Sequence, residues 1–153
     1  MTPLFSKLNL GTHATVHVLD APASFELELA ALRGVTVRRD VSGTVGFAIA
    51  FVSTLAQVEA AAGRLAGAAE GDATLWMAYP KASSKRYRCE FNRDTGWAAL
   101  GGAGFEPVRQ VAIDEDWSAL RFRRVECIAS MKRHPDGALT AAGRAKAAAQ
   151  RGR

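Results

Sequence analysis

The sequence predicts an α/β protein with a Rossmann-like, three-layer architecture: a mainly parallel sheet that ends in an antiparallel hairpin. Short apolar runs alternate with amphipathic segments over the first hundred residues, the order expected for parallel strands joined by helices. Residues 45–52 are almost wholly apolar, as a central strand buried on both faces requires. Residues 108–122 show the pattern of strand, acidic turn and strand.

Residues 1–12 are expected to be a lead-in, followed by a first strand at 14–19. Pro22 suits the first turn of a helix, which Gly34 ends before a short second strand at 35–38. The link from that strand to the central one, 39–44, is too short for a crossover helix. Either an extended segment crosses back over the sheet, or the second strand is an antiparallel edge.

Ser53 or Thr54 is predicted to cap the next helix, which ends in the glycine-containing segment 67–71. The apolar run at 73–79 is the fourth strand. A polar, basic connection at 81–91 follows it.

Asn92 or Asp94 is predicted to cap a short helix that contains Trp97. The glycine cluster at 101–104 ends this helix. In the hairpin that follows, Leu120 and Phe122 alternate with arginines, which is the period-2 pattern of a strand with one wet face.

The length of 153 residues suits one domain, which we place at 1–131, before a basic, flexible C-terminal tail at 132–153. The tail holds six basic residues and one acidic residue, whereas residues 1–131 hold fourteen of each. The folded part therefore has no net positive charge that would attract DNA. Weak, non-specific nucleic acid binding is expected of the tail alone.

The two cysteines, Cys89 and Cys127, form no metal-binding or redox motif. We expect free thiols in a cytoplasmic protein, with a buried pair as the alternative. The N-terminus lacks the charged and apolar regions of a signal peptide. No apolar run reaches the roughly 20 residues that cross a bilayer, so no membrane association is expected, and the oligomeric state is left open.

Ligands in open α/β sheets bind beyond the carboxyl ends of the strands, where the segments 20–22, 80–85 and 114–117 are predicted to converge. Their polar and aromatic members are the predicted ligand-binding residues: Asp20, Lys81, Ser83, Ser84, Lys85, Asp114, Asp116 and Trp117. The lysines and serines suit a phosphate or carboxylate group. The segment lacks the GxxxxGK[ST] spacing of a phosphate loop, and a solvated basic loop is the favoured interpretation of this segment.

The acidic turn at 114–116 admits two interpretations. Carboxylates act as general bases and as ligands of hard cations. However, aspartate at a hairpin tip also makes local hydrogen bonds, and three consecutive side chains cannot all point inward. A structural role is the favoured interpretation, with Trp117 packed on the sheet or lining a pocket.

Asp20 follows the first strand, where nucleotide-binding folds have a glycine-rich turn. The sequence Asp-Ala-Pro-Ala-Ser at 20–24 contains no glycine, so the backbone cannot approach a pyrophosphate or an S-adenosylmethionine tail closely. His13, His17 and His134 do not have the spacing of a metal site or a triad. No catalytic residue and no metal ligand is predicted, and the cofactor is left open.

Two motifs resemble a bacterial family of domains of unknown function, in which a strand ending in Ala-Trp-Pro-Lys, with a Ser nearby, precedes an Asp-Glu-Thr-Trp-Ser-Gly-Leu hairpin. The matching segments here are Ala-Tyr-Pro-Lys-Ala-Ser-Ser at 78–84 and Asp-Glu-Asp-Trp-Ser-Ala-Leu-Arg-Phe at 114–122. Tyr79, Asp116 and Ala119 depart from the family pattern. The resemblance implies the fold and a single domain, and it carries no activity.

The absence of a nucleotide turn and of a catalytic constellation favours a non-enzymatic module that binds a ligand or partner, with a small anion as the expected ligand. The alternative is an enzyme or sensor for a molecule that bears a phosphate or carboxylate. It would use Lys81, Ser84, Asp114 and Trp117 in the strand-end cleft.

Overall fold

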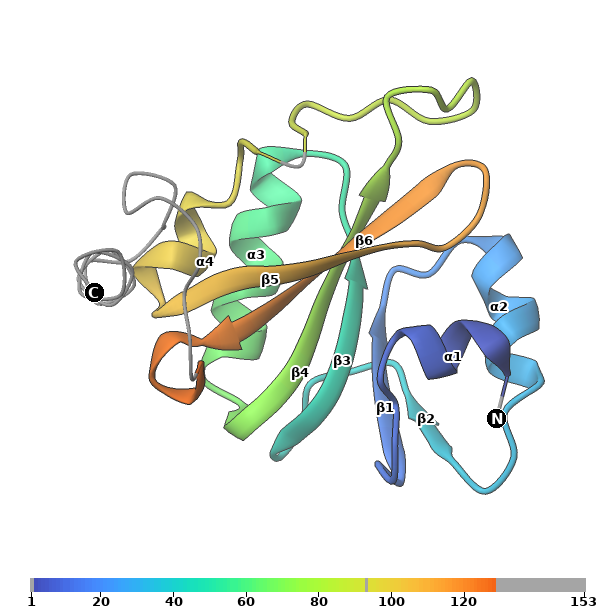
Figure 1. Ribbon diagram of the computed structural model, residues 1–153, viewed down its shortest axis with the longest axis vertical. Helices are drawn as coiled ribbons and strands as arrows, with labels where there is room; N and C mark the ends of the chain where they lie inside the picture. Colours follow the sequence, from blue (N-terminus) through green and yellow to red (C-terminus); the bar gives the residue numbers. More distant parts are fainter. Residues whose placement is uncertain (1, 93, 129–153) are drawn as a thin grey trace, which may run out of the picture.

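The computed structural model describes residues 2–92 and 94–128, so the predicted tail at 132–153 lies outside the described residues. Within them, six strands form one sheet in the order β2-β1-β3-β4-β6-β5 (Figure 1). The strands are β1 (Thr15–Leu19), β2 (Thr36–Arg38), β3 (Val45–Phe51), β4 (Ala69–Pro80), β5 (Phe105–Ala112) and β6 (Trp117–Arg124).

The first four strands run parallel, and β6 is antiparallel to both of its neighbours, β4 and β5. The hairpin therefore folds back so that its second strand enters the sheet and its first strand forms the edge. The predicted α/β, Rossmann-like fold with a mainly parallel sheet and a closing antiparallel hairpin is confirmed.

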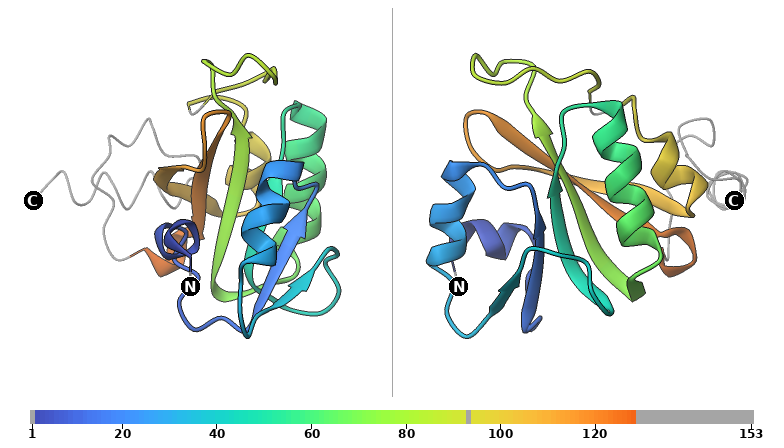
Figure 2. Two further views of the ribbon diagram at one scale, coloured as in Figure 1. Left: turned by 90° about the vertical axis from the view of Figure 1, so that its right-hand side faces the viewer. Right: turned by 180° about the vertical axis from the view of Figure 1, so that it is seen from behind.

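Helices cover both faces of the sheet, which makes the three layers. The helical segments are α1 (Pro3–Lys7), α2 (Ala23–Ala30), α3 (Leu55–Ala66), α4 (Ala98–Gly102) and a 3-10 turn, η1 (Val125–Cys127). Apolar side chains of α1 and α2 share one core cluster with β1 and β3. Those of α3 and α4 form a second cluster with β4 and β6, on the face that the right-hand view of Figure 2 turns toward the reader.

Helix α1 lies in a segment expected to be only a lead-in. Its first turn carries Pro3, and the Thr2 hydroxyl accepts a hydrogen bond from the Phe5 amide at 3.2 Å. The fully buried Trp76 donates its indole N–H to the carbonyl of Leu8 at 2.8 Å. Tertiary packing against β4 thus stabilises a helix that is too short to form alone.

Strand β2 is a parallel edge, so the antiparallel alternative is wrong. It pairs with the first half of β1, from Thr15 opposite Thr36 to His17 opposite Arg38, while β3 pairs on the other side of β1. The link 39–44 therefore crosses β1 as an extended segment. The ring of His17 holds it there, with Nδ1 2.9 Å from the Asp40 carbonyl oxygen.

Helix α3 begins with the predicted cap. Thr54 and Gln57 form a capping box, in which each side chain accepts a hydrogen bond from the other residue's backbone N–H. The caps predicted for α4 are wrong, because Trp97 occupies the N-cap position. Asn92 instead closes a turn, and its Oδ1 accepts from the Asp94 amide at 2.8 Å. Gly96, with φ of +90°, reverses the chain between that turn and the helix.

The alternation predicted for β6 is present. Leu120 and Phe122 are buried in the core under α3 and α4, opposite Met77 and Leu75 of β4. Arg123 lies on the other face and binds both carboxylate oxygens of Asp72, at 2.6 and 3.0 Å.

Candidate functional site

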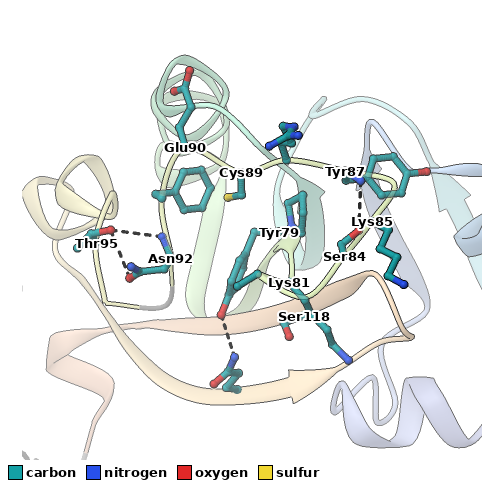
Figure 3. Close-up of a pocket in the computed structure, with 15 residues that line it drawn as sticks. Tyr79, Lys81, Ser84, Lys85, Tyr87, Cys89, Glu90, Asn92, Thr95 and Ser118 are labelled. Carbon is teal, nitrogen blue, oxygen red and sulfur yellow. Dashed lines mark hydrogen bonds between the residues drawn. The ribbon is translucent and has the colours of Figure 1, made fainter.

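A cavity of about 860 Å³ lies beyond the carboxyl end of β4 (Figure 3). The end of β4, the loop after it and two residues of the hairpin form its walls. Its described lining residues are Tyr79, Pro80, Lys81, Ala82, Ser84, Lys85, Tyr87, Arg88, Cys89, Glu90, Phe91, Asn92, Thr95, Gln110 and Ser118. The predicted site segment at 80–85 thus opens onto a space of ligand size.

Hydrogen bonds fix the start of the loop to the tip of the hairpin. The Lys81 amide donates to the Asp116 carbonyl at 2.7 Å, which extends the pairing of β4 with β6 by one residue. The Ser84 hydroxyl donates to Asp116 Oδ1 at 2.8 Å and accepts from the Tyr87 amide at 3.2 Å. Hydrogen bonds to Asp116 and within the turn at 81–87 therefore hold the cationic part of the loop in place.

Farther along, the loop is attached to the start of α3. The Glu90 amide donates to the Ser53 carbonyl at 3.0 Å, and the Leu55 amide donates to Glu90 Oε2 at 2.9 Å. A carboxylate at a helix N-terminus satisfies a backbone donor that has no partner in the helix and meets the positive end of the helix dipole.

The middle of the cavity is formed by Tyr79, which is almost fully buried. Its hydroxyl accepts a hydrogen bond from Gln110 Nε2 at 2.8 Å. Its ring lies 6.0 Å from that of Phe91 and 5.5 Å from that of Trp97. This packing joins the end of β4, the loop and the start of α4 into one continuous wall.

The charge of the lining is positive. Lys81, Lys85 and Arg88 line the cavity, and Glu90 is the one acidic residue among the described lining residues. The Glu90 carboxylate is already bound at the N-terminus of α3. Within residues 2–92 and 94–128, no ion pair forms on the three cationic side chains. They remain available to an anion.

The Cys89 side chain also lines the cavity. Burial raises the pKa of this thiol above its ordinary value, which keeps it in the weakly nucleophilic, protonated form. Both cysteines are free, as expected. The described part of the chain holds no cluster of three or more His, Cys, Asp or Glu side chains suited to a metal ion.

Three of the residues predicted from the sequence, Lys81, Ser84 and Lys85, come together in the cavity. Ser83 lies in the same loop, but its side chain is exposed and is not part of the described lining. Asp116 stands behind the lining, where it holds Ser84.

Asp114 has a structural place in the hairpin tip. Its Oδ1 accepts from the amides of Asp116 and Trp117 at 2.8 and 2.9 Å. Its Oδ2 accepts from the Ser24 hydroxyl of α2 at 3.3 Å. The tip therefore bridges α2 and the loop after β4, which brings the three predicted segments to one edge.

Aromatic side chains lie where the strand order reverses, beside the ends of β1 and β3. The ring centroid of the buried Trp117 lies 5.1 Å from that of Phe51 and 5.0 Å from that of Tyr87. The ring centroids of Phe51 and Phe25 are 4.8 Å apart. We call Phe25, Phe51, Trp117 and Tyr87 the aromatic row. It stands near the crevice in which open α/β sheets usually hold a ligand.

Asp20 belongs to this part of the edge and does not line the large cavity. It is exposed and has φ of +59°, so the turn after β1 uses aspartate in the left-handed conformation that glycine usually takes. Asp20 therefore shares the edge of the sheet with the lysines and serine that were predicted to act with it, but is not among the described lining residues of their cavity.

Several lining residues were missed by the sequence analysis, notably Tyr79, Asn92, Thr95, Gln110 and Ser118. Two signals were available. The stretch between Lys81 and Trp97 is longer than most connections in compact domains, and long ordered loops are often functional. A register for the pairing of β6 with β4 would also have placed Ser118 opposite Tyr79, as the structure does.

No described helix combines the length and the apolar character of a membrane span. No family model and no curated protein matches the sequence. Solved structures similar to this chain include N-methyltransferase NodS from Bradyrhizobium japonicum WM9, at 15% identity and a TM-score of 0.46, over 79% of this chain and 92% of that one. Another is the pyocyanin biosynthetic protein PhzM, at 14% identity and a TM-score of 0.47, over 79% of this chain and 54% of that one.

Proposed function

We propose that this domain binds a small molecule through its phosphate or carboxylate group, in the cavity beyond the carboxyl end of β4. The observation that carries the proposal is the charge of the lining. The described lining holds three cations and one acidic residue, and that carboxylate is held by the first turn of α3. An anion gains charge-assisted hydrogen bonds there without having to displace an existing ion pair.

The aromatic row favours a site at the end of β4 over the usual nucleotide site after the first strand. In nucleotide-binding sheets a glycine-rich turn after the first strand lets a pyrophosphate approach the backbone. Here that turn is Asp20-Ala21-Pro22, and the rings of Phe25 and Phe51 pack beside it. The ligand is accordingly placed at β4 rather than between β1 and β3.

Binding rather than catalysis is the activity that we propose. Cys89 is the one thiol among the described lining residues. Burial raises its pKa, which opposes formation of the nucleophilic thiolate. Ser84 accepts from a backbone amide and donates to a carboxylate, and it has no histidine beside it in the described lining. These features suit a sensor or ligand-binding module in the cytoplasm.

Isothermal titration of the full chain with inorganic phosphate and with citrate tests the proposal. Lys85→Ala and Lys81→Ala are expected to weaken binding about tenfold or more each, the effect of losing a hydrogen bond to a charged group, about 1.5 kcal/mol or more. The matched control is Arg86→Ala, which removes an exposed cation of the same loop outside the described lining. An equal loss in the control would show diffuse attraction to a basic chain and would refute the site.

A further inference from the structure

The cavity is much larger than an anionic group needs. Its volume of about 860 Å³ is near the upper end of small-molecule pockets, roughly 300–1,000 Å³. Figure 3 shows Ser84 and Lys85 at one end, Asn92 and Thr95 at the other, and Tyr79 between them. An anion bound by the lysines would leave the second end for the rest of the ligand.

That second end offers hydrogen-bonding groups without charge. Asn92 uses Oδ1 to accept from the Asp94 amide, and the hydroxyl of Thr95 lies 3.3 Å from the same oxygen. Gln110, beside the Tyr79 hydroxyl between the two ends, uses Nε2 to donate to that hydroxyl. Within the described part of the chain, Asn92 Nδ2 and Gln110 Oε1 make no hydrogen bond, so a donor and an acceptor remain for a ligand.

The aromatic side chains of the lining are less available. Tyr79 and Phe91 are only 4% and 8% exposed, because their rings pack on each other and on Trp97. A nucleobase needs an open ring face on which to stack. Hydroxyl groups, which both donate and accept, match the free amide atoms better.

We therefore infer that the ligand is a sugar-like anion, a hydroxyl-bearing body with one phosphate or carboxylate group. The inference rests on the proposed function, since it assumes that the lysine end holds the anion. The lysine end would bind the charge, and Asn92 and Gln110 would select the hydroxyl-bearing body.

Calorimetric titrations of the full chain with matched pairs of probes test this inference. Ribose 5-phosphate is compared with inorganic phosphate, and gluconate with acetate, which separates a phosphate source from a carboxylate source. In at least one pair the hydroxyl-bearing probe is expected to bind about tenfold more tightly, the effect of two further hydrogen bonds.

Gln110→Ala and Asn92→Ala are each expected to reduce that advantage about threefold while the affinity for inorganic phosphate stays unchanged. Thermal melting checks that each variant is folded. Asn92→Asp, which keeps Oδ1 as the acceptor for the Asp94 amide and removes the Nδ2 donor, replaces Asn92→Ala if that variant melts early.

The outcomes separate the two proposals. If neither inorganic phosphate nor acetate, nor either hydroxyl-bearing probe, binds to the wild-type chain, the proposed anion site itself fails. If the simple anions bind and neither hydroxyl-bearing probe binds more tightly, only the sugar-like body is refuted. Tighter binding of adenosine 5′-monophosphate than of ribose 5-phosphate would also overturn it, by showing that a base is recognised.

Discussion

Glu90 links the cavity to α3, and its replacement should change stability and binding in opposite directions. The Leu55 amide donates to Glu90 Oε2 at 2.9 Å at the start of the helix, and the same side chain lines the cavity with its three cations. Glu90→Gln keeps a carbonyl oxygen as acceptor and removes the charge. Glu90→Ala removes both.

The loss of stability can be worked from the helix contact. A negative charge in the first turn of a helix contributes about 0.3–1 kcal/mol, and a hydrogen bond about 0.5–1.5 kcal/mol. Glu90→Gln should therefore lower the free energy of unfolding by about 0.5 kcal/mol, and Glu90→Ala by about 1 kcal/mol. For a chain of 153 residues, the second value corresponds to a fall in Tm of about 2–4 °C.

The gain in anion affinity follows from Coulomb's law. Two unit charges about 8 Å apart in water interact by about 0.5 kcal/mol, so removing the one carboxylate should tighten phosphate binding about twofold. Urea unfolding and isothermal titration measure the two effects on the same samples. If Glu90→Gln loses stability and binds phosphate no more tightly than wild type, the anion does not bind beside Glu90 and the reasoning is refuted.

Three further predictions concern the fold. Trp76→Phe should cost about 2–3 kcal/mol in urea unfolding, because it leaves a buried carbonyl without its 2.8 Å indole donor and creates a cavity; a loss below about 1 kcal/mol would contradict the contact. Gly96→Ala should lower the free energy of unfolding by about 2 kcal/mol or more, since φ is +90° and a Cβ would lie 2.6 Å from the nearest side-chain carbon. Gly102→Ala, in α4 and with no atom within 4 Å of the added Cβ, should leave the stability unchanged or raise it by up to about 1 kcal/mol. Equal effects of the two changes would refute the strained turn. The hydrogen bond from Arg123 lowers the pKa of Asp72 in the folded protein below its ordinary value. The pair therefore stabilises the fold fully at pH values above the ordinary pKa of aspartate. This stabilisation is lost as the pH falls through the lowered pKa of the folded protein. Asp72→Asn should therefore cost about 0.5 kcal/mol at pH 7, a value reduced by solvent screening, and nothing near pH 2; a difference independent of pH would contradict the pair.

The strands of the sheet could be predicted from the sequence because their apolar patterns are strong. The continuous apolar run at 45–52 has few alternatives to a buried parallel strand, and it is β3. The alternation of Leu120 and Phe122 with arginines likewise placed β6. Helix α1 was missed because five residues carry almost no periodicity, and its stability comes from Trp76, far away in the sequence.

The site was harder to predict, because its parts come from elements that are distant in the chain. Lys81, Ser84 and Lys85 form a local motif and could be identified. Gln110 and Ser118 reach the cavity only through the pairing of β6 with β4 and of β5 with β6. The direction of β2 was equally undecided, since it depends on how the link 39–44 packs across His17.

Amide chemical shifts distinguish a ligand that binds beyond β4 from one that binds between β1 and β3. Nuclear magnetic resonance spectra of the full chain, titrated with ribose 5-phosphate and with inorganic phosphate, report each backbone N–H separately. The amides of Ser84 and Lys85 are expected to shift in a saturable way, while those of Asp20 and Ala21 stay in place. Saturable shifts confined to Asp20 and Ala21 would contradict a site beyond β4, because the ligand would then occupy the edge beside the aromatic row.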